Sequence, residues 1–152
     1  MEKIGIIDLG SNSARLVIVN LFTEGHFMVV DELKESVRLG QDMDRDGFLK
    51  PQRVAETIKT LKMFKRLCDA SSVDRIIAVA TAAGRDAAAV EAAYAKGYAA
   101  TADTAAVRRA KNQRSFLDEI QATCNIKIRV LSEEEEATLV YRGVINTMDI
   151  PK

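Results

Sequence analysis

The sequence has few of the residues that build disulfide frameworks or cysteine-based metal sites. It contains two cysteines, Cys68 and Cys124, and one histidine, His26. The cysteines stand far apart and have neither a C-x-x-C partner nor a nearby histidine, so neither a disulfide framework nor a cysteine-based metal site is indicated. It also lacks any apolar run approaching the ~18 residues that a membrane-spanning helix needs. A membrane partner is therefore not expected.

The chain has no excess of charge of either sign. Lysine plus arginine and aspartate plus glutamate each number 22 among 152 residues, which gives a formal net charge of +0. No basic stripe stands out, and a nucleic-acid partner is therefore not expected. The first residues read as a strand and not as a charged leader followed by an apolar segment, which predicts a cytoplasmic protein. The length is that of one ordinary domain with a hydrophobic core.

The most informative stretch runs from Lys3 to Leu21 and is typical of a strand, a tight turn and a second strand. Its turn begins with Gly10, which lets the backbone turn, and continues with small polar residues whose amide N–H groups can form an anion-binding concavity. A phosphate would fit there. Asp8 ends the first strand and is placed to hold a divalent metal that neutralises phosphate oxygens. The alternative is a hairpin whose polar residues only form the turn.

The rest of the chain alternates between strand and helix patterns. A short connection makes the third strand antiparallel, Pro51 opens an amphipathic helix, and a continuous apolar run then reads as a buried parallel strand. The order predicts an α/β fold, a mixed five-stranded sheet of three antiparallel and then two parallel strands with helices on the faces. The further expected elements are strands at 26–37, 75–80 and 127–131 and helices after 51, around 116–120 and from 132 to about 147.

A run of acidic residues opens the last expected helix. Ser132 and Glu135 have the spacing of a capping box, and acids in a first turn complement the helix dipole. Helix capping is sufficient to explain most of the run. Glu136 is the exception, because it adjoins Ala137, which begins the expected packed face. It also stands near the carboxyl end of the last strand, so its carboxylate could face a phosphate held beside Asp8.

Five segments carry a family resemblance by their order and spacing: DLGSNSARL at 8–16, VRLG at 37–40, VAT at 79–81, VRRAKN at 107–112 and LSEEEEATLVYRGV at 131–144. Together they resemble the amino-terminal part of the exopolyphosphatase and guanosine pentaphosphate phosphohydrolase family, within the actin and hexokinase superfamily. The resemblance implies a ribonuclease-H-like (actin-like ATPase) domain, Mg²⁺ as cofactor, polyphosphate or guanosine pentaphosphate as substrate, and a homodimeric parent protein.

The resemblance also implies roles for individual residues. Glu136 matches the general base that prepares water to attack the terminal phosphorus, and the first loop, beside Asp8, cradles phosphate and magnesium. Arg85 stands at the usual distance from a strand end and could replace Arg108 in the motif. The phosphate-contacting residues implied are Gly10, Ser11, Asn12, Ser13, Arg15 and either Arg108 or Arg85.

Two departures from the family pattern stand out. An Ala-rich segment, Gly84–Ala106, interrupts the pattern and reads as a helical insertion. The sequence printed here stops at Lys152, before the second phosphate loop of the D-x-G-G-G-S type and the second domain that the family pattern implies. Because phosphoryl transfer depends mostly on positioning and electrostatic stabilisation, we expect the isolated chain to be inactive or nearly so.

The sequence is also compatible with two other functions. The chain could be a non-catalytic module that binds phosphate or guanosine tetraphosphate, or a fragment of a small-molecule kinase from the same superfamily. A kinase transfers phosphate to an acceptor, whereas a glutamate beside a phosphate loop suits water. Release of orthophosphate with and without acceptors would separate the two reactions.

Overall fold

The computed structural model describes residues 1–23, 26–43, 46–80 and 106–138. Arg85, the expected insertion up to residue 105 and the expected last helix beyond residue 138 lie outside these ranges. Within them, no helix is both long and apolar enough to cross a bilayer.

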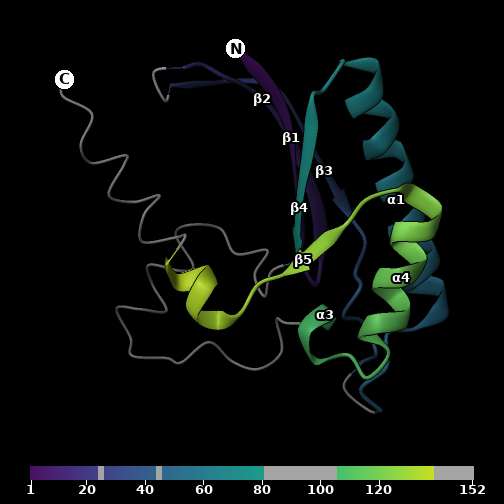
Figure 1. Cartoon of the computed structure of the whole chain (residues 1–152). Coiled ribbons are helices and arrows are strands. Elements are labelled where there is room, and N and C mark those ends of the chain that lie inside the picture. Colours follow the sequence, from purple (N-terminus) through teal and green to yellow (C-terminus); the bar gives the residue numbers. More distant parts are fainter. Residues whose placement is uncertain (24–25, 44–45, 81–105, 139–152) are drawn as a thin grey trace.

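One mixed sheet forms the centre of the domain (Figure 1). Its strand order is β3-β2-β1-β4-β5, in which β1–β2 and β2–β3 pair antiparallel and β1–β4 and β4–β5 pair parallel. This confirms the predicted sheet, and it brings the carboxyl ends of β1, β4 and β5 to one edge. The strands are β1 (Glu2–Leu9), β2 (Ser13–Leu21), β3 (Phe27–Ser36), β4 (Arg75–Ala80) and β5 (Ile128–Val130).

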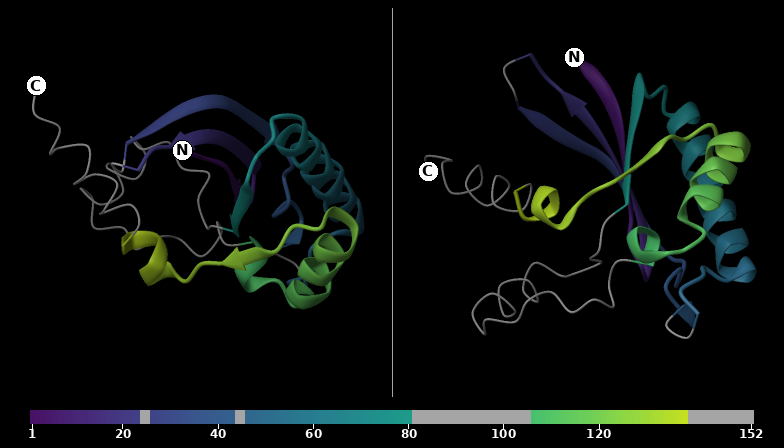
Figure 2. Two further views of the ribbon diagram at one scale, coloured as in Figure 1. Left: turned by 45° about the horizontal axis from the view of Figure 1, so that its top comes forward. Right: turned by 60° about the horizontal axis from the view of Figure 1, so that its bottom comes forward.

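Two helices, α1 (Pro51–Ala70) and α4 (Gln113–Cys124), cover one face of the sheet (Figure 2). Pro51 occupies the first turn of α1, where its missing N–H leaves no hydrogen bond unmade. Asn125 ends α4 in the left-handed conformation, at φ 53°. Both predicted helices are thus confirmed. Their largest fully buried side chains are Leu61, Phe64, Phe116 and Ile120.

The other face of the sheet carries Asp8. Ile7 and Leu9 on either side of it are 0% exposed in the core under the helices, and strand side chains alternate between faces, so Asp8 lies on the opposite face. Residues 133–138, the described part of the last helix, also leave the sheet on the side away from α1 and α4, as Figures 1 and 2 both show. Asp8 and this helix therefore share one side of the molecule.

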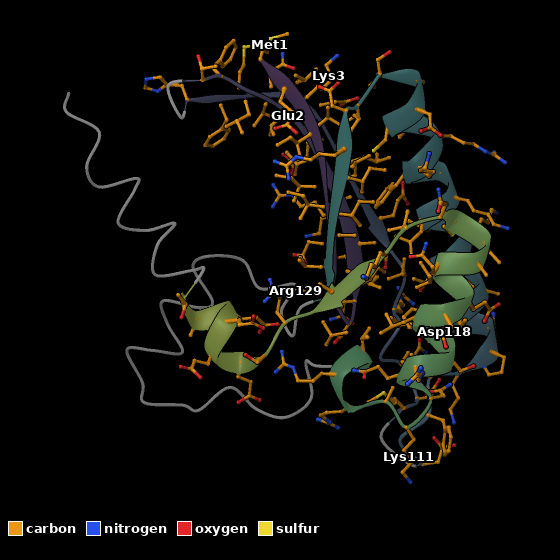
Figure 3. All side chains as sticks on the ribbon, viewed as in Figure 1. Met1, Glu2, Lys3, Lys111, Asp118 and Arg129 are labelled. Atoms are coloured by element: carbon orange, nitrogen blue, oxygen red, sulfur yellow. The ribbon has the colours of Figure 1, made fainter. Side chains whose placement is uncertain are left out.

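A single helical turn that the sequence pattern did not predict, α3 (Ala106–Arg109), lies below the sheet. Hydrogen bonds join the segment that follows α3 to the loop before α1. Asn112 accepts a hydrogen bond from the Leu49 N–H at 2.9 Å and donates one to the Leu49 carbonyl at 3.1 Å. The Lys111 N–H donates a hydrogen bond to the Gly47 carbonyl at 2.8 Å. Lys111 is labelled in Figure 3. These contacts fix α3 against the core.

The segment after β3 holds the turn between β1 and β2. The N–H groups of Val37 and Arg38 both donate to the Asn12 carbonyl at 2.9 Å, and the Gly40 N–H donates to the Ser11 carbonyl at 2.9 Å. Arg38 adopts a left-handed backbone, with φ 49°, to allow this double contact. The VRLG stretch is therefore a backbone clamp on the turn.

Gly40 is the position at which the clamp, the turn and α3 come closest. A Cβ added there would lie 3.2 Å from the Ala106 Cβ and 3.3 Å from the Ser11 Cβ. Both distances are tighter than ordinary van der Waals contact, so any side chain would force the neighbours apart.

We therefore expect Gly40→Ala to lower the free energy of unfolding by about 1–3 kcal/mol, because the added methyl group overpacks this junction. Urea unfolding monitored by circular dichroism measures the loss. Ala106→Gly supplies the matched test, since it removes one of the two Cβ atoms that the new methyl group would meet. The double variant should be more stable than the sum of the single effects predicts, by at least ~0.5 kcal/mol. Simple additivity would show that the two positions do not meet.

Candidate active site

The turn Gly10–Ser13 at the end of β1 is closed by its own backbone. The Gly10 N–H donates to the Ser13 carbonyl at 2.9 Å, and the carbonyls of Ser11 and Asn12 accept from the VRLG clamp. Because the C=O and N–H of a trans peptide point in opposite directions, the N–H groups of Asn12 and Ser13 point away from the clamp. The N–H groups of Asn12 and Ser13 thus lie on the side of the turn away from the clamp, whereas the Gly10 N–H is used within the turn.

Gly10 does not use the left-handed backbone that glycine adopts most readily, and the expected clash of a side chain at this position stays a prediction. No residue of Gly10–Ser13 has a positive φ, and the glycine with a positive φ in the described ranges is Gly47, at 77°. The turn closes through the hydrogen bond between Gly10 and Ser13 with backbone angles that other residues also adopt.

Ser11 connects the turn to α3. Its side chain is buried, with 7% of the residue exposed, and its hydroxyl oxygen accepts a hydrogen bond from the Ala106 N–H at 3.1 Å. Ala106 was expected to end the insertion, yet it is 2% exposed and belongs to the packed fold. Ser11 therefore has a structural contact in addition to the predicted phosphate contact.

Asp8 is the carboxylate next to the turn. In the described part of the chain, no three histidine, cysteine, aspartate or glutamate side chains come together as a metal site. A single carboxylate is still suitable for Mg²⁺, which keeps several waters and often binds through one or two carboxylates plus phosphate oxygens. Asp8 thus fits a magnesium ion that binds together with a phosphate, and not a prebuilt metal cage.

Arg15 lies directly opposite Asp8 in the pairing of β1 with β2. Its guanidinium is about half exposed and forms an ion pair with Glu32 of β3, with 2.5 Å between Nη2 and Oε1. Because β3 lies on the far side of β2 from β1, the guanidinium is turned away from Asp8. Its phosphate contact stays a prediction.

The acidic run after β5 begins with the predicted capping box. The Ser132 N–H donates to Glu135 Oε2 at 3.0 Å, and the Glu135 N–H donates to Ser132 Oγ at 3.2 Å. The hydrogen bond from the Ser132 backbone is also the main reason that the pKa of Glu135 is lowered. Glu135 in addition pairs with Arg129, which Figure 3 labels on β5. Glu135 is therefore a structural residue of the helix start.

Glu136 makes a different contact, to α3. Arg108 donates from Nη2 to Glu136 Oε1 at 2.9 Å and from Nε to the Leu131 carbonyl at 3.0 Å. Both side chains are mostly buried, at 22% exposed for Arg108 and 18% for Glu136. The structure thus brings together two residues that the resemblance assigned to one site. Ala137, by contrast, is exposed, so the prediction that it belongs to the packed face of the helix is wrong. The helix instead turns Glu136 toward α3, where it binds Arg108.

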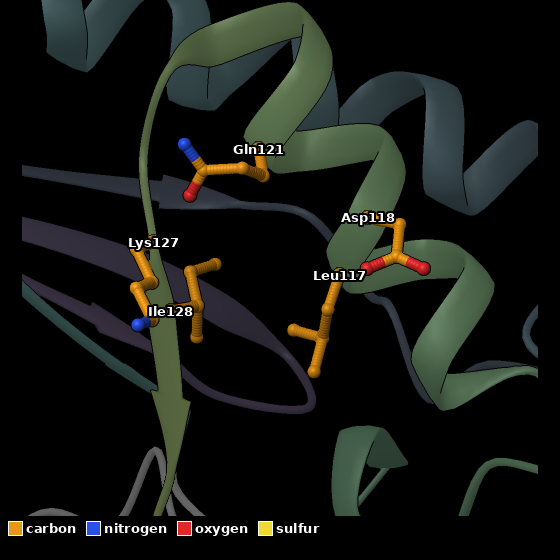
Figure 4. Close-up of a pocket in the computed structure, with 5 residues that line it drawn as sticks. All are labelled: Leu117, Asp118, Gln121, Lys127 and Ile128. Carbon is orange, nitrogen blue, oxygen red and sulfur yellow. The ribbon is translucent and has the colours of Figure 1, made fainter.

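A separate hollow of about 430 Å³ lies between α4 and β5 (Figure 4). It adjoins the amino-terminal end of β5, whereas the candidate site lies at the carboxyl end. None of the predicted site residues lines it. The residues that line it are Leu117, Asp118, Gln121, Lys127 and Ile128.

Two groups that position this site were missed by the sequence reasoning. They are the backbone N–H of Ala106 and the backbone carbonyl of Leu131, which bind Ser11 and Arg108. Backbone groups leave no signal in a side-chain pattern, and α3 is too short to show helical periodicity.

Comparisons with known proteins agree with the resemblance. The bifunctional 3-dehydroquinate synthase/phosphatase of Fusobacterium nucleatum is 28% identical over 149 residues, which cover 94% of this chain and 19% of that protein. Exopolyphosphatase 1 of Mycobacterium bovis is 22% identical over 142 residues, which cover 93% of this chain and 35% of that protein.

Solved structures share the fold. A Ppx/GppA family member from Aquifex aeolicus superposes with a TM-score of 0.70 at 30% identity, over 89% of this chain and 36% of that one. An exopolyphosphatase from Cytophaga hutchinsonii superposes with a TM-score of 0.74 at 26% identity, over 94% of this chain and 38% of that one. The chain thus spans between about a fifth and two fifths of the length of these relatives.

The family itself is shown by a match over most of the sequence. Residues 17–94 and 100–152 match the Ppx/GppA phosphatase family. Together with the actin-like fold of the structural neighbours, this match shows that the chain belongs to the Ppx/GppA phosphatase family.

Proposed function

We propose that this chain is the amino-terminal part of a phosphohydrolase that releases terminal phosphate from inorganic polyphosphate or guanosine pentaphosphate. The observation that carries the proposal is the hydrogen bond from Arg108 to the carboxylate of Glu136, in the helix that leaves the sheet on the side of Asp8. Two of the relatives are named exopolyphosphatases, which favours polyphosphate as the substrate.

The turn would bind the phosphate. The amides of Asn12 and Ser13 point away from the clamp, and successive N–H groups in a turn attract anions. The clamp keeps these amides in place because it binds the carbonyls of Ser11 and Asn12, which belong to the same peptide groups. Asp8 would hold Mg²⁺, which when bound neutralises charge on the phosphate oxygens.

Glu136 would accept the proton of the attacking water. A carboxylate can accept several hydrogen bonds, so the bond from Arg108 leaves it able to accept another from water. Its neighbours differ from it: Glu135 caps the helix, and the side chain of Glu133 is 82% exposed to solvent. These differences support Glu136 as the acid of the run that takes part in the proposed reaction.

The complete reaction would belong to the longer protein. Phosphoryl transfer needs charge stabilisation on several sides of the reacting group, and the described residues supply one side. We therefore propose that the isolated chain has little or no activity and that a second phosphate loop completes the site in the parent enzyme.

The test of this function is Glu136→Gln in the active enzyme that carries this sequence. Glutamine keeps the shape of the side chain but cannot accept the proton of water, so kcat for orthophosphate release from polyphosphate should fall by at least ~100-fold. KM should change little, because the substrate still binds. Phosphate release from polyphosphate with Mg²⁺ present, without any acceptor, is the assay.

Glu134→Gln is the matched control. Glu134 is an exposed neighbour on the same helix start, and its substitution should leave kcat nearly unchanged. Glu133 is not a suitable control, because one of its oxygens lies 3.4 Å from Arg108. Equal turnover by Glu136→Gln and Glu134→Gln would refute the assignment of Glu136. Phosphate transfer to an added acceptor in place of release would indicate a kinase.

A further inference from the structure

We propose that Arg108 is a positioning residue for Glu136, so that its effect on the reaction passes through the general base. This inference rests on the proposed role of Glu136. It differs from the role that the resemblance implies for Arg108, which is direct contact with phosphate.

The first support is the two-point contact of the guanidinium. Nε binds the Leu131 carbonyl at 3.0 Å while Nη2 binds Glu136 Oε1 at 2.9 Å. A guanidinium is planar, so fixing one of its nitrogens also fixes the direction of the others. Leu131 is itself anchored, because its N–H donates to the Ala80 carbonyl at 3.1 Å at the end of β4. The Glu136 carboxylate is thus connected to the sheet through the hydrogen bonds of Arg108 and Leu131.

The second support is that the backbone of Arg108 is also held. The side chain of Gln113 donates to the carbonyl of Val107 at 3.0 Å and to that of Arg108 at 3.4 Å. At the start of α3, the Ala106 N–H binds the Ser11 hydroxyl. Hydrogen bonds therefore hold α3 to Ser11 at its start and to Gln113 near its end, and they fix the backbone from which Arg108 reaches Glu136.

The third support is burial. Arg108 and Glu136 are 22% and 18% exposed, so water competes less for the carboxylate than it does at the surface. Without Arg108, the carboxylate would lose this charge-assisted hydrogen bond, which helps to fix its direction. A displacement of about 1 Å of a catalytic group can reduce the rate ~100-fold.

The alternative role of Arg108 is direct contact with phosphate, and its Nη1 nitrogen is the group that could make this contact. Within the residues that the structure describes, Nη1 is buried without a hydrogen bond, and it lies 3.4 Å from Oε1 of Glu133. If Nη1 were the functional group, Arg108 would act on the phosphate directly. The two roles differ in how the effects of Arg108 and Glu136 combine.

A double-mutant cycle in the active enzyme that carries this sequence separates the roles. Arg108→Gln alone should lower kcat by ~10–100-fold with KM changed by less than ~3-fold, because the base is misplaced while the substrate still binds. In the Glu136→Gln background, adding Arg108→Gln should change kcat by less than ~3-fold, because no base remains to be positioned. Arg129→Gln is the matched control. It removes the arginine that pairs with the neighbouring Glu135, and it should leave kcat nearly unchanged.

Effects of Arg108→Gln that multiply with those of Glu136→Gln, or that appear in KM alone, would overturn the inference and indicate a phosphate contact. Full activity of Glu136→Gln would instead overturn the proposed function, and the inference with it. Thermal unfolding of each variant checks that it is folded. If Arg108→Gln unfolds, Arg108→Lys takes its place in the cycle, because a single ammonium group cannot reproduce the planar two-point contact. The same non-additive loss of kcat is expected of Arg108→Lys, and wild-type kcat would overturn the inference.

Discussion

The parallel pairing of β4 with β1 is the constraint on which the candidate site depends. It runs in register from Ile4 opposite Arg75 to Leu9 opposite Ala80, and β5 then pairs parallel with β4. Because parallel strands end at the same edge, the turn after β1 and the helix start after β5 leave the sheet together. The bond from the Leu131 N–H to the Ala80 carbonyl extends this alignment beyond β5. Parts of the chain that are distant in sequence therefore leave the sheet at the same edge.

Backbone groups hold this site together as much as side chains do. The carbonyls of Ser11 and Asn12 are occupied by the VRLG clamp, the Ala106 N–H binds Ser11, and the Leu131 carbonyl binds Arg108. Such contacts do not depend on exposed, mobile side chains. They hold the turn and the Glu136 side chain in place, and this is the kind of preorganisation on which the proposed phosphoryl transfer would depend.

Much of the fold was predictable because each element has a strong local signal. Alternation and short connections predicted β1–β3, periodicity predicted α1 and α4, and the spacing of Ser132 and Glu135 predicted the capping box. The exposure of Ala137 was mispredicted. The helix period shows which residues share a face, but tertiary contacts decide which face of the helix turns toward the core. The bond between Arg108 and Glu136 joins residues 28 positions apart, and only the family resemblance placed both in one site.

We propose above that the turn after β1 binds the phosphate. Inorganic phosphate titrated into the ¹⁵N-labelled chain with Mg²⁺ present, followed by amide chemical shifts, tests it most directly, with sodium chloride at matched ionic strength as control. Binding should be weak, because one loop supplies few ligands, but the shifts should centre on the amides of Asn12 and Ser13. Shifts confined to the hollow between α4 and β5, with none in the turn, would contradict the claim.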